Sequence, residues 1–311
     1  MSEAVLRARP IDYARLLRVS NAPTAVADVW MGCAVATGSL TPSWPLAIFS
    51  LGSLCLYHGG MSLNDAVDAE QDAAEGRPRP IPLGAINRRA AYTIAYALLG
   101  AGLGLAGLGS WLVGSVAGLL IAIAITLFVV NYNSSVKRSP VGPVLMGMCR
   151  SMNLGLGIAV AGAAQAEAAG AAAQCTSPGV FFYVMGITWF ATDEAIGGRR
   201  SRLATGLCLS ALGIAWLALC PLWIPAPRVI AGNDTWTMLW MVAALFSLRG
   251  MVVGVLQPSP KSVGRGVGLA IQGLVLVNAT LATLYAGPQP GLAILALLPV
   301  TMLLARSIPQ T

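Results

Sequence analysis

The acidic residues of this chain are concentrated in one short stretch. Five of the twelve lie within eleven positions, at Asp65, Asp68, Glu70, Asp72 and Glu75. In a helix, which turns by about 100° per residue, four side chains of this stretch share one face. They are Asn64, Asp65, Asp68 and Asp72. Carboxylates stacked in this way repel each other unless a cation neutralises them. Such oxygen ligands suit Mg²⁺, which proteins often hold between a few carboxylates and the phosphates of a substrate.

Basic residues follow this acidic face at once, in the turn Gly76-Arg77-Pro78-Arg79-Pro80. A metal-diphosphate complex needs carboxylates for the metal and arginines for the phosphate oxygens. The alternative is a solvated acidic loop that only caps a helix. A cluster without function would rarely align on one face and be followed by an Arg-Pro turn. The sequence therefore favours a metal-diphosphate site.

The elements that position these residues are membrane helices. Of the 311 residues, 56% are hydrophobic and 10% charged, and the mean hydropathy is +0.73. Soluble domains carry roughly a quarter charged residues. A helical span needs about 20 apolar residues, and ten stretches qualify: 21–40, 44–62, 90–110, 111–131, 141–163, 179–197, 203–223, 236–256, 263–286 and 289–305. No polar linker separates them, so we expect a single all-α bundle over 1–311, of about nine spans and a possible tenth within the C-terminal segment 287–311.

The placement of lysines and arginines predicts the orientation of the bundle. Basic residues precede the first span and follow the second, fourth, sixth and eighth, whereas the alternate loops hold almost none. Residues 1–20 and the acidic face would thus lie on the cytoplasmic side of a membrane, which we take to be the bacterial inner membrane. The net charge of +7 is then a topology signal, and we expect no nucleic-acid partner.

The cysteines and the single histidine indicate no metal centre of their own. The six cysteines are scattered, with no C-x-x-C pair or Cys/His cluster, so neither a zinc site nor a disulfide framework is expected. His58 has no second histidine to share a metal with. We expect a hydrogen-bonded histidine between helices.

Two motifs of the chain resemble those of the UbiA superfamily of intramembrane prenyltransferases. The family pattern N-D-x-x-D-x-x-x-D is matched at Asn64, Asp65, Asp68 and Asp72. The R-P-x-P-x-G turn is matched at Arg79, Pro80, Pro82 and Gly84. A further landmark after the fourth span, Tyr132 with Lys137-Arg138, has a spacing one residue longer than usual. The resemblance extends through the ninth span, which makes 287–311 an addition.

The resemblance implies a cavity that opens to the cytoplasm and to lipid, in which Mg²⁺-bound prenyl diphosphate ionises and an acceptor attacks the carbocation. The expected metal ligands are the four residues of the acidic face, with Asp65 and Asp68 also counted as catalytic. Arg79 and Lys137 would contact phosphate oxygens. Asn21, in the R-x-x-N element of the first span, would face the same cavity.

The second acidic motif of the family is incomplete here. At the end of the sixth span Asp193 matches its first position, followed by Glu194, and glycines and arginines replace the later aspartates. We expect Asp193 to be catalytic and Glu194 to bind substrate. Arg199 would serve as a phosphate counter-charge in place of a metal, unless the arginines here only fix the topology. The incomplete motif leaves open a non-catalytic protein that binds or transports an isoprenoid-like metabolite.

Arg150 is the basic residue placed deepest in a predicted span. Burying its charge costs at least about 2.5–3.5 kcal/mol, so we expect a phosphate or carboxylate contact, the alternative being a side chain that reaches the interface. The segment 147–157, together with the Glu-x-x-Gly-Gly end of the sixth span, is similar to a UbiA-like subgroup encoded in bacterial clusters of the ebo type. A CDP-alcohol phosphotransferase is disfavoured because its D-G-x-x-A-R signature is absent.

Overall fold

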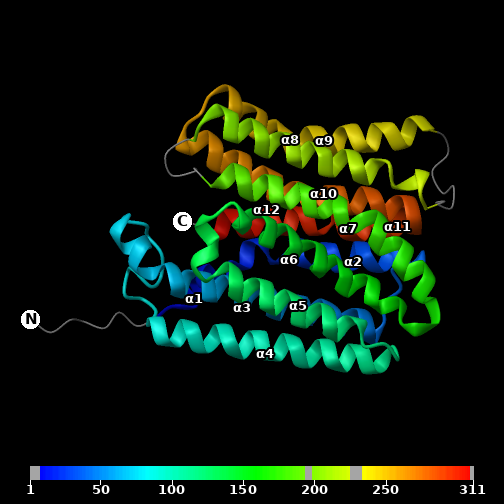
Figure 1. Ribbon diagram of the computed structural model, residues 1–311, viewed down its shortest axis with the longest axis horizontal. Coiled ribbons are helices and arrows are strands. Elements are labelled where there is room, and N and C mark those ends of the chain that lie inside the picture. Colours follow the sequence, from blue (N-terminus) through cyan, green and yellow to red (C-terminus); the bar gives the residue numbers. More distant parts are fainter. Residues whose placement is uncertain (1–7, 193–197, 225–232, 309–311) are drawn as a thin grey trace, which may run out of the picture.

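The computed structural model describes residues 8–192, 198–224 and 233–308, and every regular element in them is helical. In chain order the α-helices are α1 (Pro10–Leu16), α2 (Ala22–Thr37), α3 (Trp44–Ala74), α4 (Arg88–Leu112), α5 (Ala117–Tyr132), α6 (Val141–Ile158), α7 (Ala166–Ala191), α8 (Arg200–Ala218), α9 (Asn233–Leu256), α10 (Pro260–Ala286), α11 (Pro288–Leu295) and α12 (Leu297–Ser307). Short 3₁₀ turns are η1 (Val19–Asn21), η2 (Ser135–Arg138), η3 (Ala159–Ala161), η4 (Ala163–Gln165) and η6 (Cys220–Leu222). Long helices lie side by side along the molecule, and α4 and α9 lie near opposite edges (Figure 1).

In the described residues each predicted span overlaps a helix, although α4 ends at Leu112 and α7 already begins at Ala166. The tenth span is divided into α11 and α12 at Ala296. Among the described helical segments, seven are long and apolar enough to cross a membrane by length and composition. α2 and α5 have 16 residues each, shorter than the usual span. The all-α membrane bundle is thus confirmed, with its count of nine spans as an approximation.

α3 is the helix that matters most for the site, because it runs past its apolar part. Its N-cap Ser43 accepts a hydrogen bond from the Leu46 amide, and the helix continues for 31 residues to Ala74. The acidic stretch is therefore helical, as its spacing predicts. Its last turns carry the acidic face beyond the apolar span 44–62.

Glycines let the helices approach closely. Gly157 of α6 lies so near Val29 of α2 that a Cβ would collide with the Val29 carbonyl oxygen. In the α7–α8 pair, a Cβ on Gly206 would come within 2.8 Å of the Gly186 oxygen. Packing of this kind replaces the hydrophobic effect in holding helices together within lipid.

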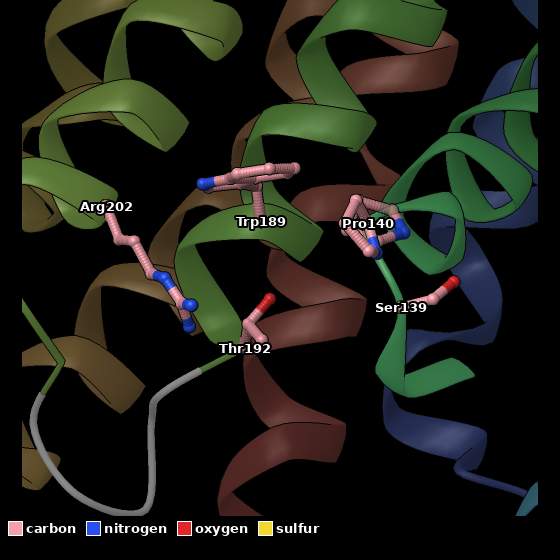
Figure 2. Close-up of a pocket in the computed structure, with 6 residues that line it drawn as sticks. Ser139, Pro140, Trp189, Thr192 and Arg202 are labelled. Atoms are coloured by element: carbon pink, nitrogen blue, oxygen red, sulfur yellow. The ribbon is translucent and has the colours of Figure 1, made fainter. Parts of the chain in front are cut away.

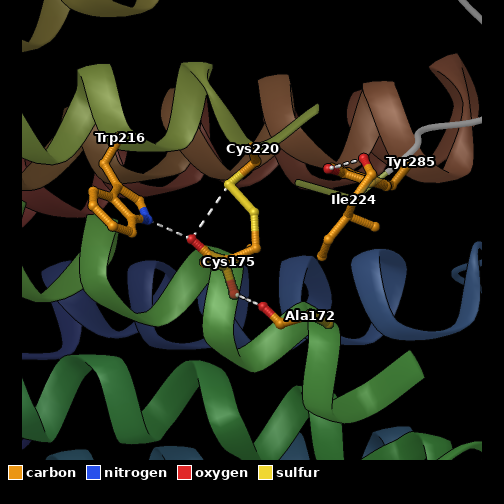
Figure 3. The surroundings of a disulfide bond; sticks show 7 residues. Ala172, Cys175, Trp216, Cys220, Ile224 and Tyr285 are labelled. Carbon is orange, nitrogen blue, oxygen red and sulfur yellow. Dashed lines mark hydrogen bonds between the residues drawn. A yellow bond between two sulfur atoms is a disulfide. The ribbon is translucent and has the colours of Figure 1, made fainter. Parts of the chain in front are cut away.

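Two of the scattered cysteines form a disulfide, which the sequence, with no disulfide framework indicated, did not predict. Cys175 of α7 and Cys220 of η6 are bonded, with Cα atoms 5.7 Å apart and a sequence separation of 45. α7 and α8 form an antiparallel pair that brings the start of one helix to the end of the other. Trp216 Nε1 donates to the Cys175 carbonyl at 2.7 Å beside the bond (Figure 3). Sequence spacing alone cannot indicate such a pairing.

Reducing this disulfide should destabilise the fold. A cross-link restricts the unfolded chain and typically contributes about 2–4 kcal/mol. We expect Cys220→Ser to lower the thermal unfolding midpoint in detergent, and a thiol reductant to lower that of the wild type to the same value. Cys208→Ser, at an exposed free cysteine, is the matched control and should leave the midpoint unchanged. Equal unfolding midpoints for the wild type, Cys220→Ser and Cys208→Ser would contradict a stabilising role of the disulfide.

Candidate active site

The acidic face of α3 is largely buried where the helix leaves its apolar part. The exposed fractions of Asn64, Asp65 and Asp72 are 8%, 4% and 2%, and the Asp68 side chain is 14% exposed. A buried carboxylate needs a partner, since an unpaired ion in a low-dielectric site is strongly unfavourable. The structure supplies each carboxylate with a basic side chain.

Asp65 is the centre of this charge network. Its Oδ1 lies 2.7 Å from Arg79 Nη1 and 3.1 Å from Arg18 Nη2. Arg79 Nη1 also lies 3.2 Å from Asp72 Oδ2, so one guanidinium spans two turns of the acidic face. Arg77 Nη1 approaches Asp72 Oδ1 at 3.6 Å from the solvent side.

Lys137 and Asn133 bring the α5–α6 connection to the same face. Lys137 Nζ pairs with Asp68 Oδ2. Burial lowers the pKa of Lys137 below its ordinary value, and the Asp68 carboxylate opposes that shift. Asn64 Nδ2 donates to Asn133 Oδ1 at 2.9 Å. The sequence-predicted Asn64, Asp65, Asp68, Asp72, Arg79 and Lys137 are thus brought together.

The Arg-Pro turn positions Arg79. The Arg77 amide donates to the Asp72 carbonyl at 2.9 Å, which folds the chain back over the end of α3. The Leu83 amide donates to the Arg79 carbonyl at 3.0 Å, and Gly84 then takes φ 71°, a conformation that glycine adopts without steric cost. Prolines at 78, 80 and 82 restrict the turn further.

Arg18 was not singled out from the sequence as a phosphate ligand, yet it contacts Asp65. It is the one non-glycine residue with positive φ in the part of the chain that the structure describes, at φ 48°. Backbone strain of this kind concentrates at functional sites. Tyr57 Oη donates to the Arg18 carbonyl at 3.3 Å, and His58 Nδ1 lies 2.7 Å from the Leu17 carbonyl. His58 is therefore hydrogen-bonded between elements, as predicted.

A cavity of about 620 Å³ opens beside this network. Arg18, Asn21, Arg77 and Arg79 are among the residues that line it. The other lining residues are uncharged, and they include Thr192 at the end of α7 and Ile271 and Gln272 of α10. Ala305 of α12 also lines it. The C-terminal addition thus contributes to the cavity wall.

Arg150 lies deeper in the bundle and pairs with a carboxylate from the chain itself. Its Nε is 2.7 Å from Asp28 Oδ2, and Asp28 is fully buried. Arg150 also lines a small apolar pocket between α3, α5 and α6. Sequence reasoning missed Asp28, although an acidic residue in the middle of a predicted span is a signal for a functional or paired charge.

The structure describes only part of the incomplete second motif. Asp193 and Glu194 lie outside the described residues. Arg199 is exposed and is the N-cap residue of α8. A small pocket on this side is lined by Ser139, Pro140, Trp189, Thr192 and Arg202 (Figure 2). It joins the end of α7 to the α5–α6 connection that carries Lys137.

Comparison with known proteins now decides the family. A sequence model of the UbiA prenyltransferase family matches residues 25–266, most of the chain. The chain belongs to this family. With its apolar helices it is an integral, multi-pass membrane protein.

Two curated relatives of this UbiA-family protein are archaeal. It is 33% identical over 129 residues to the digeranylgeranylglyceryl phosphate synthase of Methanoculleus marisnigri, covering 42% of this chain and 44% of that protein. The synthase of the same name from Metallosphaera sedula is 30% identical over 97 residues, 31% of this chain and 32% of that protein. The chain thus spans less than half the length of the curated relatives it matches.

Solved structures of UbiA homologues share the fold. One from Aeropyrum pernix K1 has a TM-score of 0.62 at 14% identity over 83% of this chain and 96% of that chain. One from Archaeoglobus fulgidus, bound to GPP and Mg²⁺, has a TM-score of 0.58 at 16% identity over 92% and 99%. A structure of digeranylgeranylglyceryl phosphate synthase has a TM-score of 0.61 at 19% identity over 88% and 98%.

The acidic face fits a magnesium ion in the chemistry of its donors. Asn64 and the three carboxylates are hard oxygen ligands, and Asp72 Oδ2 is buried without a hydrogen bond. In the described residues, however, no three acidic, His or Cys side chains form a ready coordination shell. Arg18, Arg79 and Lys137 instead hold the carboxylates in separate ion pairs.

Proposed function

We propose that this chain is a Mg²⁺-dependent prenyltransferase that moves a prenyl group from a prenyl diphosphate to an acceptor. The observation that carries the proposal is the convergence of Arg18, Arg79 and Lys137 on the acidic face of α3 at the mouth of a large cavity. Membership of the prenyltransferase family and the GPP and Mg²⁺ bound to the A. fulgidus homologue support it.

The basic residues act by changing partners. Without substrate they neutralise the carboxylates; with a diphosphate present, Arg18, Arg79 and Lys137 turn to its oxygens. The carboxylates of Asp65, Asp68 and Asp72, with Asn64, are then free to hold a metal. A Mg²⁺ ion held by these residues would supply the positive charge that a diphosphate leaving group requires. Binding of the metal and of the diphosphate is therefore coupled.

The remaining residues orient the substrate and exclude water. Asn21 and Gln272 present amide groups to the cavity. The apolar pocket below the acidic face, formed by side chains such as Leu56, Met61 and Val129, would hold the hydrocarbon chain. A dry wall protects the carbocation from attack by water. Asp193, Glu194 and Arg199 stay proposed contributors on sequence grounds alone.

We also propose that the site faces the cytoplasm of a bacterial inner membrane. The loops that carry Arg77, Thr192 and Pro260 border one cavity, so they share one end of the bundle. Basic loops of membrane proteins favour the cytoplasmic side. The Cys175–Cys220 disulfide lies at the far end of α8 from Arg200. Disulfides persist in oxidising compartments, which supports the same orientation.

A transfer assay tests the proposed function. Purified protein in nanodiscs is given radiolabelled geranyl diphosphate, Mg²⁺ and a lipid extract of the source cells as acceptor. We expect label to enter an extractable lipid product at a rate that falls to background when Mg²⁺ is chelated. Saturable binding of the donor without any product would instead favour a binder or transporter of an isoprenoid-like metabolite.

A further inference from the structure

The apolar pocket below the acidic face follows one side of α3 toward the middle of the bundle. Tyr57 and Met61 line it, and Asp65 lies one turn further along the same helix. Ile125 and Val129 of α5 form the facing wall. The pocket is small, about 100 Å³, against about 620 Å³ for the cavity at the mouth. A prenyl chain whose diphosphate is bound at Asp65 would enter this pocket with its hydrocarbon tail first.

Two polar side chains from α6 lie among the apolar residues that line this pocket. Among the lining residues, Arg150 carries the one charge and Asn153 the one amide. Both side chains bind Asp28, at 2.7 Å from Arg150 Nε and 3.1 Å from Asn153 Nδ2. Asn278 Nδ2 of α10 donates to the other carboxylate oxygen at 2.7 Å. The Asp28 carboxylate is therefore bound by side chains of two other helices, α6 and α10.

Further hydrogen bonds hold the two lining side chains in place. Arg150 Nη2 donates to Thr24 Oγ1 at 2.6 Å. Asn153 accepts from Ser53 at 2.5 Å and donates to the Ala25 carbonyl at 3.0 Å. Moving Arg150 aside would leave the fully buried Asp28 without its counter-charge. Breaking a buried pair in this way is strongly unfavourable, so a hydrocarbon chain does not displace it.

We propose that Arg150 and Asp28 form a polar floor that stops the prenyl chain and restricts the donor to short chains of five or ten carbons. The inference rests on the proposed function and specifies its donor. Burial of apolar surface favours each isoprene unit that contacts Leu56, Ile125 or Val129. A unit that reaches Arg150 gains no such contact and blocks the polar groups from their partners.

The test removes the charged pair that forms the proposed floor and compares prenyl diphosphate donors of different chain length. Asp28→Asn combined with Arg150→Met removes both charges together, keeps an acceptor for Asn278, and replaces the guanidinium by a flexible apolar side chain. Transfer from the five-, ten- and twenty-carbon diphosphates is measured, together with binding of the matching non-cleavable thiolodiphosphates. We expect the twenty- to ten-carbon ratio to rise at least tenfold over the wild type. An unchanged ratio in a folded variant would overturn the proposal.

A second variant narrows the same pocket at Gly60 of α3, which faces Val129 of α5. A Cβ at Gly60 would lie 3.3 Å from Val129 Cγ1, so Gly60→Ala should lower the ten- to five-carbon ratio at least threefold. This variant decides the matter if the double variant does not fold; an unchanged ratio would then count against the inference. Ser50→Ala is the control, because it removes the buried Trp30–Ser50 hydrogen bond away from this pocket.

Failure of the proposed function and failure of the polar-floor inference give different results. A wild type that binds thiolodiphosphates but transfers no donor refutes the proposed function, and the binding ratios still decide the role of the floor. Transfer from all donors at equal rates refutes the floor alone.

Discussion

Replacing Asp65 and Asp68 together by asparagine should abolish prenyl transfer while the protein stays folded in the membrane. The change keeps the shape of both side chains and removes two negative charges from the acidic face. The expected loss is at least about 100-fold in rate, the scale found when an electrostatic group that acts on the transition state is removed. The nanodisc transfer assay measures it, with the elution volume of the purified protein as the check on folding.

Glu70→Gln is the matched control for this double variant. Glu70 is on the same helix but points away from the acidic face, with its side chain 85% exposed and paired with Arg88 at 2.6 Å. We expect transfer at close to the wild-type rate. If Glu70→Gln lowered transfer as much as the double variant, the effect would belong to the charge of the helix end as a whole and not to the acidic face.

Replacing Arg79 by methionine should damage both stability and binding. The Arg79 side chain is 12% exposed and spans Asp65 and Asp72, whose side chains are 5% and 3% exposed. Without it, Asp72 keeps only the more distant Arg77. Truncating one partner of a buried ion pair costs about 3–5 kcal/mol, so we expect a lower unfolding midpoint together with a large loss of affinity for the diphosphate.

Comparing the affinity for the diphosphate with the unfolding midpoint distinguishes a binding role of Arg79 from a purely structural one. Arg79→Lys keeps the charge but loses the two-pronged geometry that fits phosphate, so it should recover the midpoint more fully than the affinity. Arg89→Met, at an exposed arginine on the first turn of α4, should change neither. Equal recovery of midpoint and affinity in Arg79→Lys would assign Arg79 to structure alone.

Hydrophobic runs and helical spacing predicted the framework of the fold. In the part of the chain that the structure describes, each of the ten apolar stretches overlaps a helix, because about 20 apolar residues in lipid have few other ways to satisfy the backbone. The acidic face was also predictable, since spacing alone places Asp65, Asp68 and Asp72 on one side of α3. The same reasoning predicted that basic residues near it in sequence, such as Arg79, belong to the same site.

Contacts between distant helices were the part that sequence could not predict. Arg18 pairs with Asp65 from a backbone in the left-handed conformation, which no propensity of arginine indicates. The Asp28–Arg150 pair joins α2 to α6 across 122 residues, and Cys175 meets Cys220 through the pairing of α7 with α8. Arg150 was expected to need an anionic partner, but its identity depended on which helices pack together.

Equilibrium binding of a non-cleavable prenyl thiolodiphosphate tests the central claim most directly. The account predicts that Mg²⁺ raises the affinity of the wild type for this analogue at least tenfold, because the diphosphate draws Arg18, Arg79 and Lys137 away from the carboxylates that hold the metal. In the Asp65→Asn, Asp68→Asn double variant the effect of Mg²⁺ should disappear. Equal affinity with and without Mg²⁺ in the wild type, or an undiminished effect of Mg²⁺ in the double variant, would contradict a metal-diphosphate site on the acidic face of α3.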